Sequence, residues 1–179
     1  MNFLSVNLKS PKNKQAGFTL TELILYMGLL IILITILSQI FSSILDVQLE
    51  SKSTSSVELD GRYILTKLMH DMRLMQTNLP MNDNIITPSV PGSTNPTLNF
   101  TVNSINYTYS LNNGNFELIN DKGTNNLNSV NTFITALQFT RIGTGANTDT
   151  IQVNFTLTSK IKGNAGPETR NYTTTISSQ

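Results

Sequence analysis

The most distinctive pattern in the chain is an uncharged apolar run near its N-terminus. Residues 23–45 contain no charged side chain and are dominated by Leu and Ile. As a helix, this run would extend about 34 Å at 1.5 Å per residue, which is enough to cross the apolar core of a bilayer. The alternative, a buried helix of a soluble protein, is disfavoured because the rest of the chain is too small and polar to surround it. The run therefore predicts a membrane-spanning helix.

The helical pattern continues beyond the apolar run. Between Asp46 and Leu79 there is no proline, and Pro80 supplies a stop. Apolar side chains recur there every three or four residues, namely Val57, Ile64, Leu65, Leu68, Met72, Met75 and Leu79, with Tyr63 and Met69 beside them. This stripe predicts one continuous helix from Phe18 to Leu79 whose second half is amphipathic. His70 lies within the stripe, and we interpret it as structural rather than as a ligand.

Two kinds of position modify this helix. Low helix propensity at residues 51–56 predicts a kink or an unwound turn, and Gly61 adds a second weak point. Glu58–Arg62 and Lys67–Asp71 are opposite-charge pairs four residues apart, which indicates a solvated face.

After residue 97 the period of the apolar positions changes to two. Residues 80–97 contain four prolines and predict an irregular surface loop. Alternating apolar residues predict strands within residues 98–102, 105–111, 116–119, 133–142, 151–157 and 172–177. Residues 112–115 predict a hairpin turn, and residues 143–149 and 163–167 predict loops. We therefore expect an α+β fold, in which an antiparallel sheet of five or six strands packs on the amphipathic helix.

Composition excludes several kinds of site. The chain has no Cys and one His, so disulfide scaffolds, thiol catalysis, Cys-based zinc sites and multi-His metal sites are excluded. A net charge of +1 argues against a general nucleic-acid binder and leaves specific nucleic-acid binding open. Charged residues are only 13% of the chain, which fits an exported protein. No phosphate-binding loop, paired carboxylates or nucleophile–base set is readable. We therefore expect no enzymatic activity, no metal and no cofactor.

Charge around the apolar run predicts its orientation. Residues 1–17 carry Lys9, Lys12 and Lys14 and no acid, so their removal would change the net charge from +1 to −2. Positive flanks stay in the cytoplasm, so the C-terminal part should lie outside. A secretory signal peptide fits less well, because the apolar run is longer than its usual apolar region and no small-x-small cleavage site follows.

The junction between these segments reads Gly17-Phe18-Thr19-Leu20-Thr21-Glu22-Leu23. It resembles the class III signal of type IV pilins and type II secretion pseudopilins, whose pattern is Gly, Phe, Thr, Leu, a variable residue, Glu and Leu. The resemblance implies that a prepilin peptidase cleaves between Gly17 and Phe18 and methylates the new amine of Phe18. Gly17 has no side chain, so its backbone can lie extended in a protease groove.

The resemblance also implies a role for Glu22, which would pair with the N-terminal amine of a neighbouring subunit during filament assembly. A carboxylate within a membrane helix costs about 2–3 kcal/mol at depth, which favours a functional interpretation. Pairing with the amine would satisfy both charges in a dry helix bundle. The alternative is that Glu22 lies at the interface and only extends toward water or stays protonated.

The family resemblance implies the pilin fold and a division of the chain. Residues 1–17 would be a cytoplasmic leader that is removed, and residues 18–45 the transmembrane and filament-core helix. Residues 46–79 would form the amphipathic half of the helix, which joins residues 80–179, the loop and sheet, in an extracytoplasmic globular domain. The implied partners are a prepilin peptidase, other pilin or pseudopilin subunits, the inner-membrane assembly platform and the membrane itself. The protein would be a single-pass inner-membrane protein before it enters a filament.

Two parts of the chain look like minor pilins and J-type minor pseudopilins, namely residues 58–63 followed by 65–73, and residues 105–116. The chain also lacks the C-terminal disulfide loop of many major pilins and has no proline between Phe18 and Leu79. We therefore predict a minor structural subunit of a type IV pilus, competence pilus or type II secretion pseudopilus. The alternative is an uncleaved single-pass membrane protein with an extracytoplasmic binding domain. Only the first predicts removal of residues 1–17.

Overall fold

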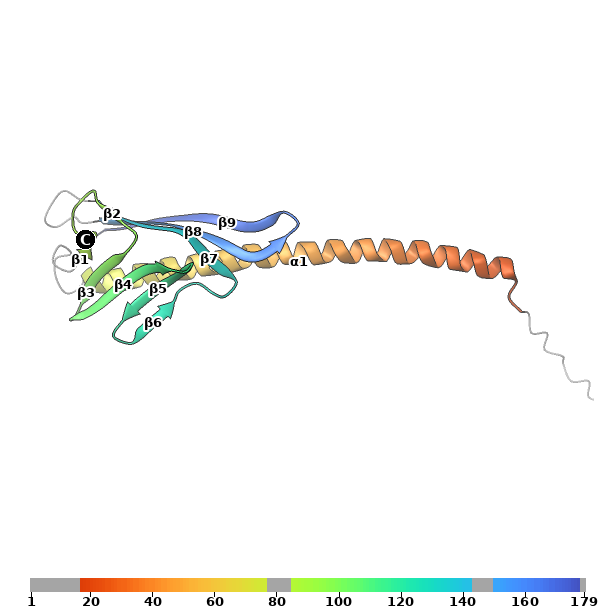
Figure 1. Cartoon of the computed structure of the whole chain (residues 1–179), viewed down its shortest axis with the longest axis horizontal. Helices are drawn as coiled ribbons and strands as arrows, with labels where there is room; N and C mark the ends of the chain where they lie inside the picture. Colours follow the sequence, from red (N-terminus) through yellow and green to blue (C-terminus); the bar gives the residue numbers. More distant parts are fainter. Residues whose placement is uncertain (1–16, 77–84, 143–149, 178–179) are drawn as a thin grey trace, which may run out of the picture. The chain divides into compact units, whose positions relative to one another are not determined.

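The computed structural model describes residues 17–76, 85–142 and 150–177 (Figure 1). By its internal contacts the chain divides into two compact units, Met1–Ser43 and Ile44–Gln179. One helix, α1 (Leu20–Gln76), begins in the first unit and ends in the second, and all described strands belong to the second.

The predicted continuous helix is present, but it begins at Leu20 rather than at Phe18. Thr19 caps the helix, so Phe18 lies outside it. The predicted end at Leu79 lies outside the described residues. The unwound turn predicted within residues 51–56 is absent, because this segment is helical throughout. Packing against the sheet outweighs the low helix propensity of its serines.

Nine strands are described, and all of their pairings are antiparallel. Their bounds are β1 Ile85–Thr87, β2 Thr94–Asn95, β3 Leu98–Val102, β4 Ile105–Asn112, β5 Asn115–Asn120, β6 Gly123–Asn126, β7 Thr132–Ile142, β8 Thr150–Gly163 and β9 Gly166–Ser177. One sheet has the order β1-β3-β4-β5-β6 and the other the order β2-β7-β8-β9. The predicted α+β class is confirmed, whereas the single sheet of five or six strands is corrected to two sheets.

The strands that the sequence missed have no alternating apolar pattern. β6 has only exposed residues, so it carries no period-two pattern of burial. β1 and β2 lie in the proline-containing segment that was predicted to be an irregular loop. The chain passes through Pro96 from β2, in one sheet, to β3, in the other.

The predicted hairpin turn between β4 and β5 is confirmed. Asn112 pairs with Asn115, and the two residues between them have positive φ angles, 48° at Asn113 and 79° at Gly114. Positive φ at both central residues is the requirement of a type I′ turn, which the Asn-Gly sequence meets at low cost. The turn therefore sets the register of β4 against β5.

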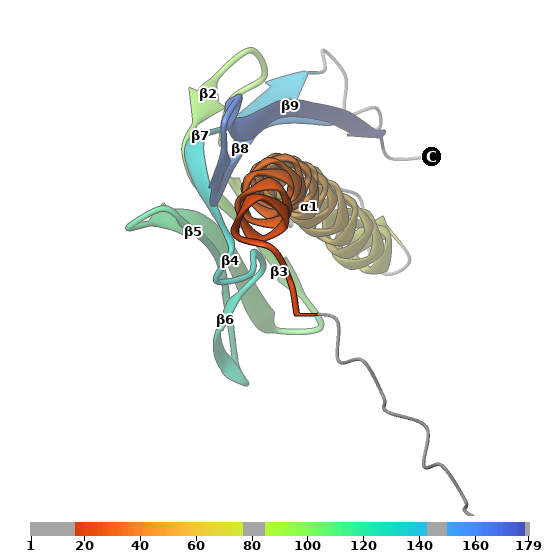
Figure 2. The ribbon, with the colours of Figure 1, turned by 90° about the vertical axis from the view of Figure 1, so that its right-hand side faces the viewer.

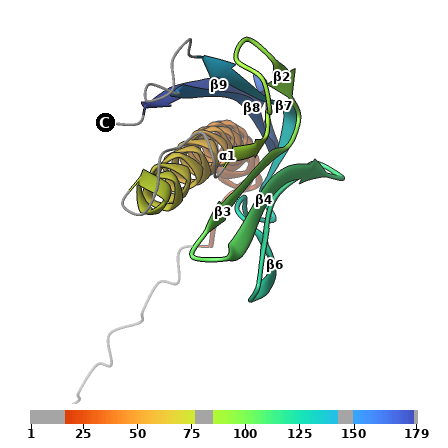
Figure 3. The ribbon, with the colours of Figure 1, turned by 90° about the vertical axis from the view of Figure 1, so that its left-hand side faces the viewer.

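The core lies between α1 and the two sheets. Figure 3 shows β3 and β4 on one side of the yellow part of α1 and β8 and β9 on the other, and Figure 2 shows the sheets from the opposite end. The helical stripe is buried as predicted at Val57, Ile64, Leu68 and Met72, each 0% exposed. Leu65 and Met69 are partly buried beside it, and Tyr63 is exposed. The side chains of Met75 and Leu79 lie outside the description.

Aromatic rings connect the two sheets. The ring centroid of Phe116, in β5, lies 6.3 Å from that of Phe139 in β7 and 6.0 Å from that of Phe155 in β8. Tyr109 in β4 packs edge-on against Phe116 on one side, and Tyr172 in β9 stacks on Phe155 on the other. Tilted and edge-on arrangements are favourable for aromatic rings. Buried side chains of the helix and of both sheets form one hydrophobic core.

The two weak points of the helix are the places where β9 approaches it. The hydroxyl of buried Ser53 accepts a hydrogen bond of 3.2 Å from the backbone N–H of Glu168. A Cβ atom on Gly61 would lie 2.2 Å from Cζ of Tyr172, whose hydroxyl donates to the carbonyl of Val57 at 3.0 Å. Small residues at these positions let the sheet lie close to the helix backbone.

Candidate processing and assembly site

The predicted processing site lies where extended chain becomes helix. The hydroxyl of Thr19 accepts a hydrogen bond of 3.3 Å from the N–H of Glu22, and the carbonyl of Thr19 accepts one of 3.1 Å from the N–H of Leu23. Thr19 is therefore the N-cap of α1, which satisfies an N–H group that the first turn leaves without a partner. Gly17 and Phe18 precede the cap and are not helical.

Gly17 and Phe18 are both open to solvent in the first unit. A Cβ atom on Gly17 would meet no atom within 4 Å, and the side chain of Phe18 is 74% exposed. A bond in extended, exposed backbone can enter a protease groove without local unfolding. The structure therefore places the predicted scissile bond in an accessible position.

Glu22 lies in the first turn of the helix and is intermediate in burial among exposed neighbours. Its Oε1 atom accepts a hydrogen bond of 3.3 Å from the hydroxyl of Tyr26, one turn further along. The ring of Tyr26 also meets the ring of Phe18 edge-on, with centroids 6.0 Å apart and planes at 76°. An acid in the first turn also interacts favourably with the helix dipole.

Phe18, Glu22 and Tyr26 thus form one cluster, of which the sequence analysis named the first two. Tyr26 was missed because it lies inside the apolar run, where an aromatic residue fits the hydrophobic pattern. Its spacing of four residues from Glu22 could have identified it, since residues four apart are neighbours on a helix.

The helix beyond this cluster has an apolar surface. Large apolar side chains from Leu23 to Leu45 are 43–65% exposed, and no residue of the most apolar stretch of the helix is buried by the rest of the described chain. By length and composition this helix could cross a membrane. An exposed surface of this kind is unfavourable in water, so it requires lipid or other protein chains to cover it.

The comparisons with known proteins agree with the junction motif. Residues 12–38 match the family model of the prokaryotic N-terminal methylation motif, which includes Gly17, Phe18 and Glu22. The comparisons with curated proteins and with solved structures give no match. The motif is consistent with the type IV pilin and pseudopilin family, and together with the apolar helix it indicates a membrane-anchored, pilin-like chain.

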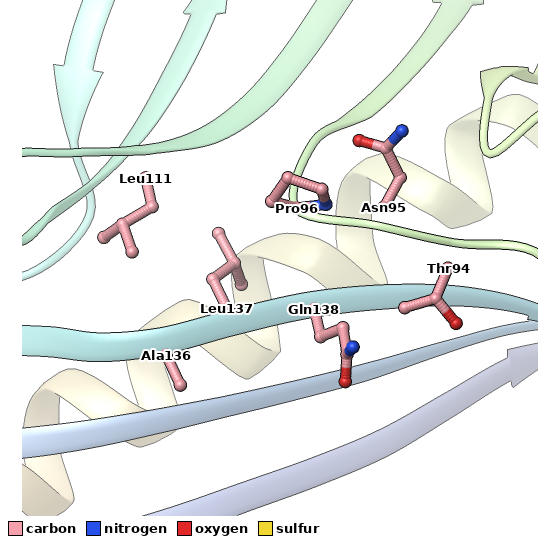
Figure 4. A pocket seen from close by; sticks show the side chains of 7 residues that line it. All are labelled: Thr94, Asn95, Pro96, Leu111, Ala136, Leu137 and Gln138. Carbon is pink, nitrogen blue, oxygen red and sulfur yellow. The ribbon is translucent and has the colours of Figure 1, made fainter.

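A second candidate site is a shallow cavity of about 490 Å³ beside β7, shown in Figure 4. Its lining consists of Thr94, Asn95, Pro96, Leu111, Ala136, Leu137 and Gln138. None of these side chains is charged, so the cavity has no group that could act as an acid or base or balance the charge of an ion. The cavity therefore provides no arrangement for catalysis.

A third candidate is the carboxylate of Asp71, which is 2% exposed. Its Oδ1 lies 2.7 Å from Nζ of Lys67 and 3.0 Å from Nδ1 of His70, and its Oδ2 accepts a bond of 2.5 Å from the hydroxyl of Tyr109. The ion pair with Lys67 is confirmed, but its predicted place on a solvated face is wrong for Asp71. The Glu58–Arg62 pair is confirmed on the exposed side.

Burial raises the pKa of Asp71, but the hydrogen bonds from Lys67, Tyr109 and His70 and the charge of Lys67 outweigh it and hold the pKa below its ordinary value. Burial first, and then the bond to Asp71, raise the pKa of Tyr109. Both carboxylate oxygens are thus occupied by side chains of this chain. The cluster attaches α1 to β4 rather than presenting a reactive group, and His70 takes part in it as a partner of Asp71.

Within the described ranges, no three His, Asp or Glu side chains lie close enough together to bind a metal ion. The cluster at the start of α1 therefore remains the strongest candidate functional site.

Proposed function

We propose that this protein is a structural subunit of a type IV pilus or a type II secretion-like pseudopilus. A prepilin peptidase cleaves it between Gly17 and Phe18, methylates the amine of Phe18, and leaves the apolar helix as the assembly element. The observation that carries this proposal is the methylation motif over residues 12–38, which spans an exposed Gly-Phe bond directly before a capped apolar helix.

In this proposal each part of the chain has its own role. Residues 1–17 are the cytoplasmic leader, and residues 18–45 anchor the subunit in the inner membrane and later form the filament core. Residues 46–79, together with residues 80–179, form the extracytoplasmic domain. The partners are the peptidase, the other subunits and the assembly platform in the inner membrane.

Glu22 pairs with the N-terminal amine of a neighbouring subunit. The position of its carboxylate in the first turn, among exposed apolar side chains, supports this role, because an unpaired charge in a dry helix bundle is costly. We further propose a minor subunit, either a minor pilin or a J-type minor pseudopilin, on the resemblance of residues 58–63, 65–73 and 105–116. The chain has no enzymatic role in this proposal.

The N-terminal mass of the full chain, extracted from membranes with and without a prepilin peptidase, tests the proposal. We expect a species that begins at methylated Phe18 only when the peptidase is present. An intact N-terminus in its presence would contradict processing and favour the alternative, an uncleaved single-pass protein with an extracytoplasmic binding domain.

Two variants separate cleavage from assembly. Gly17→Val should block cleavage in the peptidase groove. A Cβ atom on Gly17 meets no atom within 4 Å in the part of the chain that the structure describes, so misfolding of that part would not account for the loss. Glu22→Ala should be cleaved like the wild type and fail to enter sheared filaments. Normal maturation of the first variant or normal assembly of the second would contradict the corresponding role.

A further inference from the structure

The geometry points to Tyr26 as a positioning residue for Glu22, an inference that rests on the proposed assembly through Glu22. The hydroxyl of Tyr26 donates a hydrogen bond of 3.3 Å to Oε1 of Glu22. Tyr26 lies one helical turn further along the apolar run. Within the residues that the structure describes, Oε2 of Glu22 has no hydrogen bond, so this oxygen is left for the amine of a neighbouring subunit.

The hydrogen bond from Tyr26 restricts the rotamers of the Glu22 side chain. A glutamate side chain on an exposed helix surface has several rotamers of similar energy, and each lost rotamer costs free energy when an ion pair forms. A donor four residues further on selects the rotamer in which the carboxylate lies along the helix. Less rotamer freedom is then lost when the amine arrives, which favours the ion pair.

Tyr26 also contacts the residue that would carry the new amine. Its ring meets Phe18 edge-on at 6.0 Å between centroids. The chain end released by cleavage therefore packs against the same side chain that orients the acid. A leucine or valine at this position would pack in an apolar bundle equally well but would donate no proton to a carboxylate. The hydroxyl is the group that distinguishes a positioning role from a packing role.

Tyr26→Phe tests the role, because it keeps the ring and its contact with Phe18 and removes only the hydroxyl. In cells with the peptidase and the assembly machinery, the full chain with Tyr26→Phe should be cleaved like the wild type. Its incorporation into sheared filaments should fall about fivefold, which corresponds to roughly 1 kcal/mol of hydrogen-bond free energy. Tyr63→Phe, at an exposed tyrosine of the same helix, is the matched control and should assemble normally.

A spectroscopic measurement tests the hydrogen bond itself. In full-length protein labelled with ¹³C at the ζ carbon of tyrosine and reconstituted in lipid bilayers, the Tyr26 resonance is the one missing from Tyr26→Phe. We expect this resonance to move in Glu22→Ala while the other four tyrosines stay unchanged. A purely structural role of the ring would leave the resonance in place.

The outcomes separate this inference from the proposed function. If wild type and Tyr26→Phe assemble equally while Glu22→Ala fails, or if the Tyr26 resonance does not respond to Glu22→Ala, the positioning role is wrong and the assembly role of Glu22 stands. If the wild type keeps its N-terminus intact in the presence of the peptidase, the proposed function fails first.

Discussion

At the scale of single residues, Asp71 links α1 to the five-stranded sheet through the hydroxyl of Tyr109. The pairing of Lys67 with Asp71 could be predicted from their spacing, but the burial of the carboxylate could not, because it depends on the hydroxyl of Tyr109 from a strand 38 residues away. Breaking such a bond leaves a buried charge short of partners, which costs more than the bond itself contributes.

The contribution of the Asp71 hydrogen bonds should be visible in how stability depends on pH. The folded pKa of Asp71 lies below its ordinary value of 3.8, so its contribution to stability is fully present above pH 3.8 and is lost as the pH falls through the folded pKa. Tyr109→Phe should lower the free energy of unfolding by about 1–3 kcal/mol at neutral pH and move the acid loss to higher pH, because one bond that lowers this pKa is gone. Denaturant unfolding of the full chain in mild detergent, followed by circular dichroism, measures both effects.

Tyr107→Phe is the control for this prediction. Tyr107 lies in the same strand and stacks on Phe100 with centroids 5.3 Å apart, and the substitution keeps that ring. We expect Tyr107→Phe to change the free energy of unfolding by no more than about 0.5 kcal/mol. Equal losses in the two variants would contradict a special role for the Asp71–Tyr109 bond.

Gly61 provides a second prediction at this scale. Alanine would favour the helix by about 1 kcal/mol, but its Cβ would displace the ring of Tyr172, which lies within 2.2 Å. We expect Gly61→Ala to destabilise the protein by about 1–2 kcal/mol in the same unfolding measurement. In a Tyr172→Leu background the conflict disappears, so Gly61→Ala should then be stabilising. A destabilising effect of the same size in both backgrounds would contradict this explanation.

At the scale of elements, the β8–β9 hairpin lies along the part of α1 that belongs to the second unit. Its turn reaches the first helical turns of that unit, where the amide of Asn164 donates to Asp46 at 2.5 Å. Further along, β9 contacts α1 through Ser53 and Tyr172. The strands themselves follow from the period-two pattern, but their contact with serines and a glycine of the helix could not be predicted, since these residues indicate only weak helix propensity.

Ser53→Leu should therefore loosen the hairpin, whereas Ser55→Leu should not. Ser53 is 2% exposed under β9, and a larger side chain there costs about 1–3 kcal/mol, while Ser55 is exposed on the same turn of the helix. We expect the backbone amide of Glu168 to exchange with deuterium about tenfold or more faster in Ser53→Leu, and unchanged in Ser55→Leu. Equal exchange in both variants would show that the serine face does not hold β9.

At the scale of the whole molecule, the charge of residues 1–17 and the apolar run predict that the strands lie on the extracytoplasmic side of the membrane. The chain has no cysteine, so a single introduced cysteine is a unique label. Val130, in the loop after β6, is 84% exposed and is a suitable label position on the extracytoplasmic side. Lys12 is a suitable label position on the cytoplasmic side.

In spheroplasts that lack prepilin peptidase, Val130→Cys should react with a membrane-impermeant maleimide. Lys12→Cys should react only after lysis, because the positive flank stays in the cytoplasm. Labelling of Lys12→Cys in intact spheroplasts would contradict the predicted orientation and the access of a cytoplasmic-side peptidase to Gly17.

The local features of this protein could be predicted from the sequence alone. The buried stripe of α1 and six of the strands depend on spacing along the chain, because the periods of helices and strands place side chains on faces without reference to distant residues. The apolar run depends on composition, the Asn-Gly turn depends on residue types that tolerate positive φ, and the Gly-Phe-Thr-Leu junction was identified by its resemblance to a known signal. The sequence did not predict the division into two sheets, the strands β1, β2 and β6, the burial of Asp71, or the contacts of β9 with Ser53 and Gly61. Each of these depends on which surfaces meet, and that is decided by packing between segments far apart in the sequence.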